Sequence, residues 1–317
     1  MKKRLISITM AALTACTALT GCGSHSAEET PDKLTFTYVT APLNVPSIIE
    51  KEKGIFADTF ADMGISVEYA EITSGADQTQ ALASGDVQVL YAVGATSVIL
   101  SAANGADIKV LNMYSRSPKA FCLYAQDESL TTPESLRGKT IAGPAGTILH
   151  ELLVAYLATA DMTIDDVNYV NMSIPESKAA LEGGSIDVAM LAGAAAYTAK
   201  LQGQHLVADG EGLVDASIAV AVTEEFYNTH PEIIQKLIDA QAKIASFLAE
   251  NEEDALQITA KALDLDISAV REMFAQYDFS TELTEADKIS FQKTADFMAA
   301  NSMIETELDV NTLFLNK

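Results

Sequence analysis

Apolar positions along the chain form short strand-like runs that alternate with segments of helical period. Alternating or continuous apolar runs predict strands over 34–39, 66–72, 87–93, 108–114, 139–142, 167–172, 186–191 and 217–222. Helical periodicity predicts helices over 46–53, 77–83, 96–103, 147–160, 175–182, 231–251, 253–263, 268–276 and 285–301. This alternation predicts an α/β protein with largely parallel sheets and helices on both faces.

Two similar segments indicate two lobes of similar construction. Residues 81–94 and 180–193 share the order helix end, glycine, buried strand and glycine turn, with Gly85 matching Gly184 and Gly94 matching Gly193. The strand at 217–222 is expected to carry the chain back to the first lobe, so that the helical tail packs there. We therefore predict a discontinuous lobe 1 of residues 34–123 plus 223–317 and a lobe 2 of residues 124–222. The crossings, near 121–125 and 221–225, would form a hinge.

The N-terminus has the pattern of an export signal. Three basic residues, Lys2-Lys3-Arg4, precede an apolar run over 5–19 that is too short to span a bilayer comfortably. The sequence Leu19-Thr20-Gly21-Cys22 is similar to a bacterial lipobox. We predict a lipoprotein signal peptide over 1–21, a lipid on Cys22 and a flexible tether over 22–33. The alternative is an ordinary secreted protein with a chance cysteine.

The cysteines and the net charge exclude several classes of function. Cys16 leaves with the signal and Cys22 becomes the anchor, so Cys122 would stand alone, as a small buried apolar residue rather than a nucleophile. The chain has 20 basic and 44 acidic residues, which argues against nucleic-acid binding. No second apolar run reaches membrane-spanning length, so any transport channel must belong to other chains.

Several motifs in order carry a resemblance to a known family. They are Glu52-Lys53-Gly54-Ile55-Phe56, Gly64-Ile65-Ser66-Val67-Glu68, Ala81-Leu82-Ala83-Ser84-Gly85-Asp86-Val87, Leu136-Arg137-Gly138-Lys139-Thr140-Ile141-Ala142, Gly146-Thr147 and the segment 180–189 with Asp187. With the lipobox, this set resembles the nitrate/sulfonate/taurine branch of the solute-binding proteins of ABC importers, which also includes binders of the thiamine pyrimidine precursor. One departure is Gln88, where the family often has Asp; local capping is its expected role.

The resemblance implies a periplasmic-binding-protein type 2 fold, in which two Rossmann-like lobes enclose a cleft and a helical C-terminal extension follows. It also implies an extracytoplasmic, lipid-anchored monomer that delivers a small solute to permease and ATPase subunits by closing its lobes. The expected solute is a small organic compound or oxyanion such as a sulfonate, taurine or nitrate. A thiamine pyrimidine precursor, another heterocycle and an amino acid are alternatives.

Candidate ligand contacts follow from the rule that open α/β sheets bind ligands beyond the carboxyl ends of their strands. The loops at these ends supply Leu43, Asn44, Ser74, Gly75, Gly94, Thr96, Ser97, Ser115, Arg116, Ala145, Gly146, Thr147 and Gly193. The amides of Gly146 and Thr147, at a helix start, are the expected primary cradle for an oxyanion, with Arg116 secondary. The alternatives are a simply capped helix and a solvated surface arginine. Tyr91 and Tyr114 are expected in the core, although either ring has the shape to stack on a ligand.

An enzyme is the main rival of a different class. The family's eukaryotic relatives include a thiamine-pyrimidine synthase with a cysteine-rich motif, which this chain lacks. Its four histidines are scattered without metal-ligand spacing, and no phosphate-binding loop or nucleophile elbow occurs. We therefore expect no catalysis, no metal and no cofactor. A sensor ectodomain or adhesin with the same fold is a third alternative.

Overall fold

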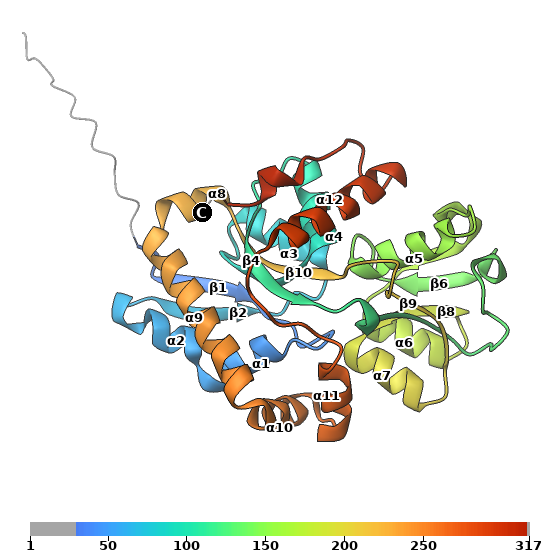
Figure 1. The fold of residues 1–317 in the computed structure, drawn as a ribbon, viewed down its shortest axis with the longest axis horizontal. Helices are drawn as coiled ribbons and strands as arrows, with labels where there is room; N and C mark the ends of the chain where they lie inside the picture. The colour runs from blue at the N-terminus through green and yellow to red at the C-terminus, as the bar shows by residue number, and fades with distance from the viewer. Residues whose placement is uncertain (1–29, 316–317) are drawn as a thin grey trace, which may run out of the picture.

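The computed structural model describes residues 30–315, which form two α/β lobes (Figure 1). The predicted signal peptide, the lipid site at Cys22 and most of the predicted tether lie outside the described residues. Within residues 30–315, no helix has the length and apolar character needed to cross a membrane.

Lobe 1 is built on strands in the order β2-β1-β3-β10-β4. These are β1 (Lys33–Thr37), β2 (Ser66–Ala70), β3 (Leu90–Gly94), β4 (Lys109–Arg116) and β10 (Ser217–Val222), with a bridge from Phe36 to Val89 joining β1 to β3. Helices α1 (Val45–Lys53), α2 (Ile55–Phe60), α3 (Gly75–Ser84) and α4 (Ala95–Ala103) connect them. β1 pairs in parallel with β2, whereas β10 runs antiparallel to β3 and β4.

Lobe 2 has a five-stranded sheet of order β7-β6-β8-β5-β9. Its strands are β5 (Phe121–Ala125), β6 (Thr140–Gly143), β7 (Asn168–Asn171), β8 (Val188–Ala192) and β9 (His205–Asp209), and its helices are α5 (Ile148–Ala158), α6 (Ile174–Glu182) and α7 (Gly193–Leu201). The pairings around β6 are parallel, and β5 is antiparallel to β8 and β9. Both sheets are therefore mixed, because each of the strands that follow a crossing, β5 and β10, runs against its neighbours.

Strand pairing moves both crossings to earlier positions than the sequence suggested. The chain passes between the lobes at 117–120, between β4 and β5, and at 210–216, between β9 and β10. Residues 121–123 thus belong to the sheet of lobe 2, and residues 217–222 to that of lobe 1. The expected boundaries at 123 and 222 were displaced because an apolar run alone does not reveal which sheet pairs with it.

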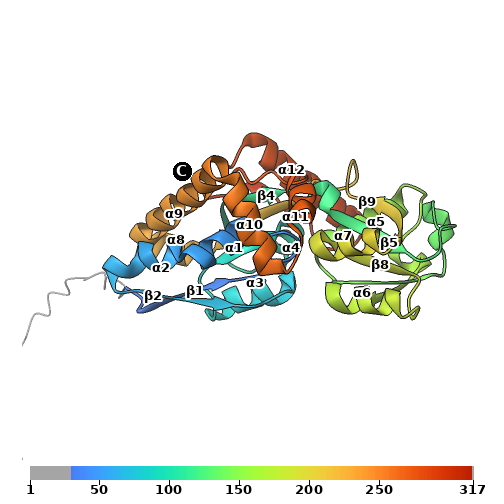
Figure 2. The same ribbon diagram turned by 90° about the horizontal axis from the view of Figure 1, so that it is seen from below.

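The C-terminal helices cover lobe 1 as expected. They are α8 (Glu224–Thr229), α9 (Pro231–Glu250), α10 (Glu252–Leu263), α11 (Ile267–Phe274) and α12 (Glu285–Ala300). The buried face of α9, which includes Ile233, Leu237, Ile244 and Leu248, has helical spacing and lies against α1 and α2. α11 reaches across to α7 of lobe 2 (Figure 2). Short 3-10 turns occur at Ala61–Met63, Pro118–Ala120, Pro133–Leu136, Ile164–Asp166 and Val310–Leu313.

The internal similarity corresponds to equivalent units in the two lobes. α3, β3 and α4 of lobe 1 match α6, β8 and α7 of lobe 2 in order. Gly85 and Gly184, which the sequence aligned, both have left-handed backbone, with φ of 79° and 67°. The prediction of two similarly built lobes is confirmed.

Candidate functional site

A pocket of about 760 Å³ lies between the lobes, at the carboxyl ends of β1, β2, β6, β7 and β8. Figure 2 shows α3 and α6, which both begin at this pocket, on the same side of the two lobes. Lobe 1 contributes Tyr38, Val39, Thr40, Ala41, Glu71, Thr73, Ser74, Ala76 and Asp77, and lobe 2 contributes Pro144, Ala145, Asn171, Met172, Ser173, Ile174, Pro175, Glu176, Ala194 and Ala195. The volume suits a small organic molecule.

Asn44 holds the loop that follows β1. Its side chain is 1% exposed, and its amide nitrogen donates to the carbonyl oxygens of Val39 and Ala41, each at 3.0 Å. Both of these residues line the pocket. The candidate contact Asn44 therefore lies behind the pocket wall and shapes it, while its neighbour Leu43 is fully buried.

The same loop meets lobe 2 at Gly193. The amide of Ala194 donates to the Pro42 carbonyl oxygen at 3.2 Å. Gly193 has a φ of 52°, and a Cβ atom there would lie 1.6 Å from the Pro42 oxygen. Only glycine allows this approach of the two backbones, because any Cβ atom at position 193 would overlap with Pro42.

Polar groups of the turn before α5 form hydrogen bonds within lobe 2. The Gly146 amide donates to Nδ1 of His150 at 3.2 Å, and the Thr147 hydroxyl donates to the Pro144 carbonyl oxygen at 2.8 Å. The amide of Ala145, which lines the pocket, donates to Oδ1 of Asn171 at 2.9 Å. The expected oxyanion cradle therefore needs correction, because the Gly146 amide is already bonded and neither Gly146 nor Thr147 lines the pocket.

His150 holds that turn in place, although no motif in its sequence neighbourhood marks it for this role. Its ring stacks on Tyr169 with centroids 5.0 Å apart and an interplanar angle of 7°. Burial lowers the pKa of His150, which favours the neutral ring whose Nδ1 can accept the Gly146 amide.

Arg116 is the second correction. Its Nε donates to Asp287 at 2.6 Å, Nη1 donates to the Ser280 carbonyl oxygen at 3.0 Å, and Nη2 donates to the Glu282 carbonyl oxygen at 3.0 Å. Although burial opposes it, the hydrogen bonds from Arg116 and Thr284 hold the pKa of Asp287 below its usual value. The guanidinium thus secures the C-terminal tail to the end of β4 and does not line the pocket.

Three of the other candidates, Gly94, Thr96 and Ser97, contact lobe 2 at the start of α4, whereas Gly75 and Ser115 make their contacts within lobe 1. The Thr96 hydroxyl donates to Glu151, and the Ser97 hydroxyl donates to the Gly146 carbonyl oxygen at 2.9 Å. Gly94 packs against Ile148, and Gly75 packs against Ser97. Ser115 is fully buried. Of the thirteen predicted contacts, the structure therefore brings only Ser74 and Ala145 to the pocket surface.

The charged side chains around the pocket are acidic. Glu71, Asp77 and Glu176 line it, and among the described residues no lysine or arginine does. Glu176 is bound in the cap of α6, where its carboxylate accepts from the amide and hydroxyl of Ser173 at 2.9 and 2.7 Å. Lys51 lies just behind this surface, 3.9 Å from Glu71 and over the Tyr38 ring. An anionic solute must therefore depend on helix N-termini and neutral donors.

The segment at the end of β7 and the start of α6 lines the pocket, although none of the predicted ligand contacts lies there. It contributes Asn171, Met172 and Ser173 to the pocket. The rule that ligands bind beyond the carboxyl ends of strands applies equally to the predicted strand at 167–172. The position of this segment, at the end of that strand, therefore indicates its place at the pocket.

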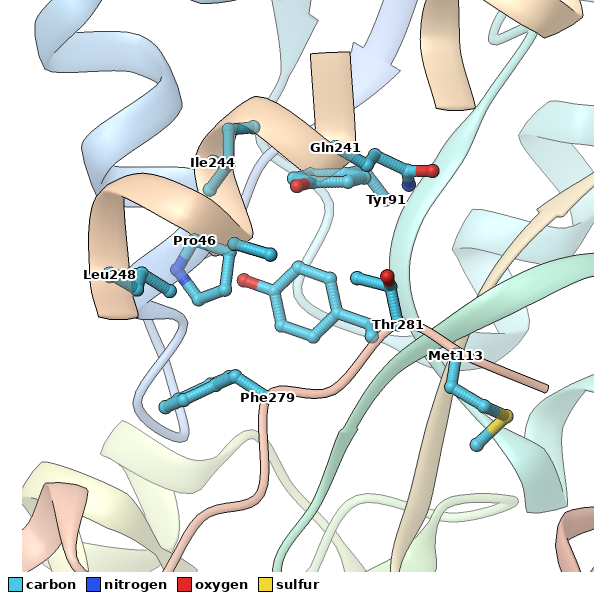
Figure 3. Close-up of a pocket in the computed structure, with 10 residues that line it drawn as sticks. Pro46, Tyr91, Met113, Gln241, Ile244, Leu248, Phe279 and Thr281 are labelled. Carbon is cyan, nitrogen blue, oxygen red and sulfur yellow. The ribbon is translucent and has the colours of Figure 1, made fainter. Parts of the chain in front are cut away.

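A second pocket, inside lobe 1, is too small for a solute. Its volume is about 10 Å³, close to the minimum for one water molecule, and Figure 3 shows Pro46, Ile244, Leu248 and Phe279 around it. Tyr91 and Tyr114 both line this pocket in the core, with ring centroids 5.0 Å apart. Their predicted core role is confirmed.

No side chain in the described part of the chain offers evident catalytic or metal chemistry at the pocket. Cys122 is 6% exposed, and burial raises the pKa of its thiol to about 12, so it is not a poised nucleophile. Within residues 30–315, no three His, Cys, Asp or Glu side chains come together as a metal site.

Comparisons with known proteins agree with this geometry. The family model described as NMT1/THI5 like matches residues 43–255, more than half of the chain. A Bacillus subtilis protein assigned to aliphatic sulfonate binding is 26% identical over 94% of this chain and 91% of its own length. The taurine-binding periplasmic protein of Escherichia coli is 31% identical over 58% of this chain and 59% of its own length.

Solved structures show the same fold. The alkanesulfonate-binding protein SsuA from Xanthomonas axonopodis pv. citri, bound to MOPS, superimposes with a TM-score of 0.82 at 20% identity, covering 92% of this chain and all of the other. The chain belongs to the NMT1/THI5-like family and has the periplasmic-binding-protein fold.

Proposed function

We propose that this protein is the solute-binding subunit of an ABC importer, which captures a small organic or oxyanionic solute between its two lobes outside the cytoplasmic membrane. The observation that carries the proposal is the 760 Å³ pocket, which takes its lining from both lobes at the carboxyl ends of their strands. Sulfonates and taurine are the first solutes to test, because relatives of this chain are named for them. Delivery implies permease and ATPase partners.

The chemistry at the pocket supports binding without catalysis. Its polar groups are hydroxyls, amides and carboxylates, and the buried Cys122 is not among them. A solute held only by hydrogen bonds and packing can leave unchanged when the lobes open.

A thermal-shift screen tests this proposal. The purified protein would be heated with sulfonates, taurine, nitrate, pyrimidines and amino acids in turn. A ligand that binds only the folded state stabilises it by about 2.7 kcal/mol at 100 times its dissociation constant. Stabilisation by one class, confirmed by calorimetry, supports the proposal; no binding by any class would count against it.

We also propose that a lipid on Cys22 anchors the protein. The support is the lipobox-like sequence Leu19-Thr20-Gly21-Cys22 behind a basic and apolar leader. Cys22→Ala should release the protein into the aqueous phase of a detergent partition or leave it unprocessed. If the variant still partitions with detergent after processing, the lipid assignment is wrong.

A further inference from the structure

Glu151 is a buried carboxylate at the contact between the two lobes. It lies on α5 of lobe 2 and is 5% exposed. Its Oε2 accepts from the Thr96 hydroxyl at 2.5 Å, and its Oε1 accepts from the Thr294 hydroxyl at 3.1 Å. Both threonines belong to lobe 1, on α4 and α12, which Figure 1 shows beside α5. One carboxylate therefore connects three helices across the lobe boundary.

This carboxylate has no cation in contact. Among the described residues, no side-chain nitrogen of lysine, arginine or histidine lies within 4.0 Å of the carboxylate oxygens of Glu151. The charged groups that act on it are Asp215, in the second crossing, and Lys293 on α12, with opposite effects, and these two pair with each other at 3.6 Å. Burial, opposed by the two hydroxyls and by Lys293, raises the pKa of Glu151 above its ordinary value.

Separation of the lobes would change this environment. Both of its hydrogen-bond partners belong to the opposite lobe, so opening removes them and admits water to the carboxyl group. In water, the pKa of a glutamate returns to about 4.3. The closed arrangement thus binds a proton at a pH at which the open arrangement has released it.

We propose that Glu151 is a proton-linked latch, which holds the lobes together more firmly as the external pH falls. This proposal rests on the proposed function, because the latch would regulate the lobe closure that captures a solute. The closed form binds the extra proton, so closure becomes more favourable as pH falls through the raised pKa and levels off below the ordinary one. For one proton, the closure equilibrium changes by at most about tenfold per pH unit.

The latch can be tested without any solute. Hydrogen exchange of the α4 and α5 backbone amides, corrected for intrinsic rates, should show increasing protection as the pH falls from about 8 to about 5. Glu151→Gln, which imitates the protonated acid, should abolish this increase; the pH dependence that remains should come from His150 and run the other way, because protonation of the buried His150 ring weakens the turn before α5. Thr294→Val removes a hydroxyl that favours the charged form, so it should move the midpoint of the change to higher pH.

Glu50→Gln is the matched control. Glu50 is also buried, at 1% exposure, and burial raises its pKa to about 7, but its partners Tyr69 and Phe56 lie in the same lobe. This variant should keep the pH dependence of the wild type. Protection that still increases towards low pH in Glu151→Gln, or an increase that disappears in Glu50→Gln, overturns the latch.

Taurine then separates this proposal from the proposed function. Its sulfonate stays ionised and its amine stays protonated across this range, so the solute contributes no pH dependence. If taurine binds, its affinity should rise as the pH falls for the wild type but not for Glu151→Gln; equal slopes would refute the latch. If neither taurine nor any other solute binds while the exchange result holds, the latch stands and the solute assignment fails.

Discussion

The two turns that the sequence marks as equivalent differ in what faces them. Gly94 ends β3 and leads into α4; Gly193 follows β8 and begins α7. A Cβ at Gly94 would lie 3.2 Å from the Cδ1 atom of Ile148, the end of a side chain, whereas one at Gly193 would lie 1.6 Å from the backbone oxygen of Pro42. The shared motif determines the local helix–strand–turn structure. The residues of the opposite lobe determine whether each turn can accept a side chain in place of glycine.

Gly193→Ala should have the largest effect. Its φ of 52° costs an L-residue about 1–2 kcal/mol, and the overlap with Pro42 adds to this by forcing the loops apart. Because the Pro42 loop and α7 both line the pocket, we expect loss of solute binding together with a lower free energy of unfolding. Calorimetry and urea denaturation measure the two. Normal binding by this variant would contradict the close backbone contact.

Asn44→Ala should have the next largest effect, because Asn44 holds the loop that receives Gly193. The variant leaves the carbonyl groups of Val39 and Ala41 without their donor, which typically costs about 1–3 kcal/mol. Solute affinity should fall with stability. Asn104→Ala is the control, since the Asn104 side chain bonds one carbonyl on an exposed helix end. Equal losses in the two variants would show that Asn44 has no special role.

The fold was predictable because each element carries its own pattern. The strand at 217–222 was predicted with its observed bounds, and the four predicted tail helices differ by one or two residues at their ends, whereas the short helix α8 was not predicted. β9 was missed, since its His205–Asp209 segment is short and partly exposed. The sheet to which residues 121–123 belong depends on pairing between distant segments, which local pattern does not encode.

The site was predictable only at the level of loops. The carboxyl-end rule located the edge of both sheets at which the pocket lies, and Ser74 and Ala145 are among its lining residues. It could not show that Arg116 is bound by Asp287, which lies 171 positions along the chain, or that His150 takes the Gly146 amide. Both are tertiary contacts made by polar residues, and their sequence neighbourhoods carry no sign of them.

A pH experiment on His150 examines the lobe 2 turn that packs against Gly94. Burial lowers the pKa of His150, so the stability that its neutral ring provides is present above the unfolded pKa of about 6.5 and is lost as pH falls through the folded value. The raised pKa of Glu151 changes the stability in the opposite direction as the pH falls. The effect of replacing His150 should therefore be measured in a protein that already carries Glu151→Gln. There, adding His150→Gln should reduce the loss of stability between about pH 7 and pH 5. Parallel unfolding curves for the two variants would exclude this role.

Gly94→Ala should have the smallest effect, and its sign depends on one neighbour. At φ −67° and ψ 142°, the backbone of Gly94 suits alanine, and replacing glycine at a compatible position stabilises by about 0.4–1 kcal/mol through the unfolded state. The contact with the end of Ile148, which is 4% exposed, opposes this gain. Ile148→Val removes the Cδ1 atom, 3.2 Å from the position of the new methyl group, but keeps a carbon at the Cγ1 position, 3.3 Å away. Gly94→Ala should therefore be close to neutral alone and more favourable when added to Ile148→Val, as denaturant midpoints of the four proteins would show. If it is as damaging as Gly193→Ala in both backgrounds, the two turns do not differ as the structure indicates.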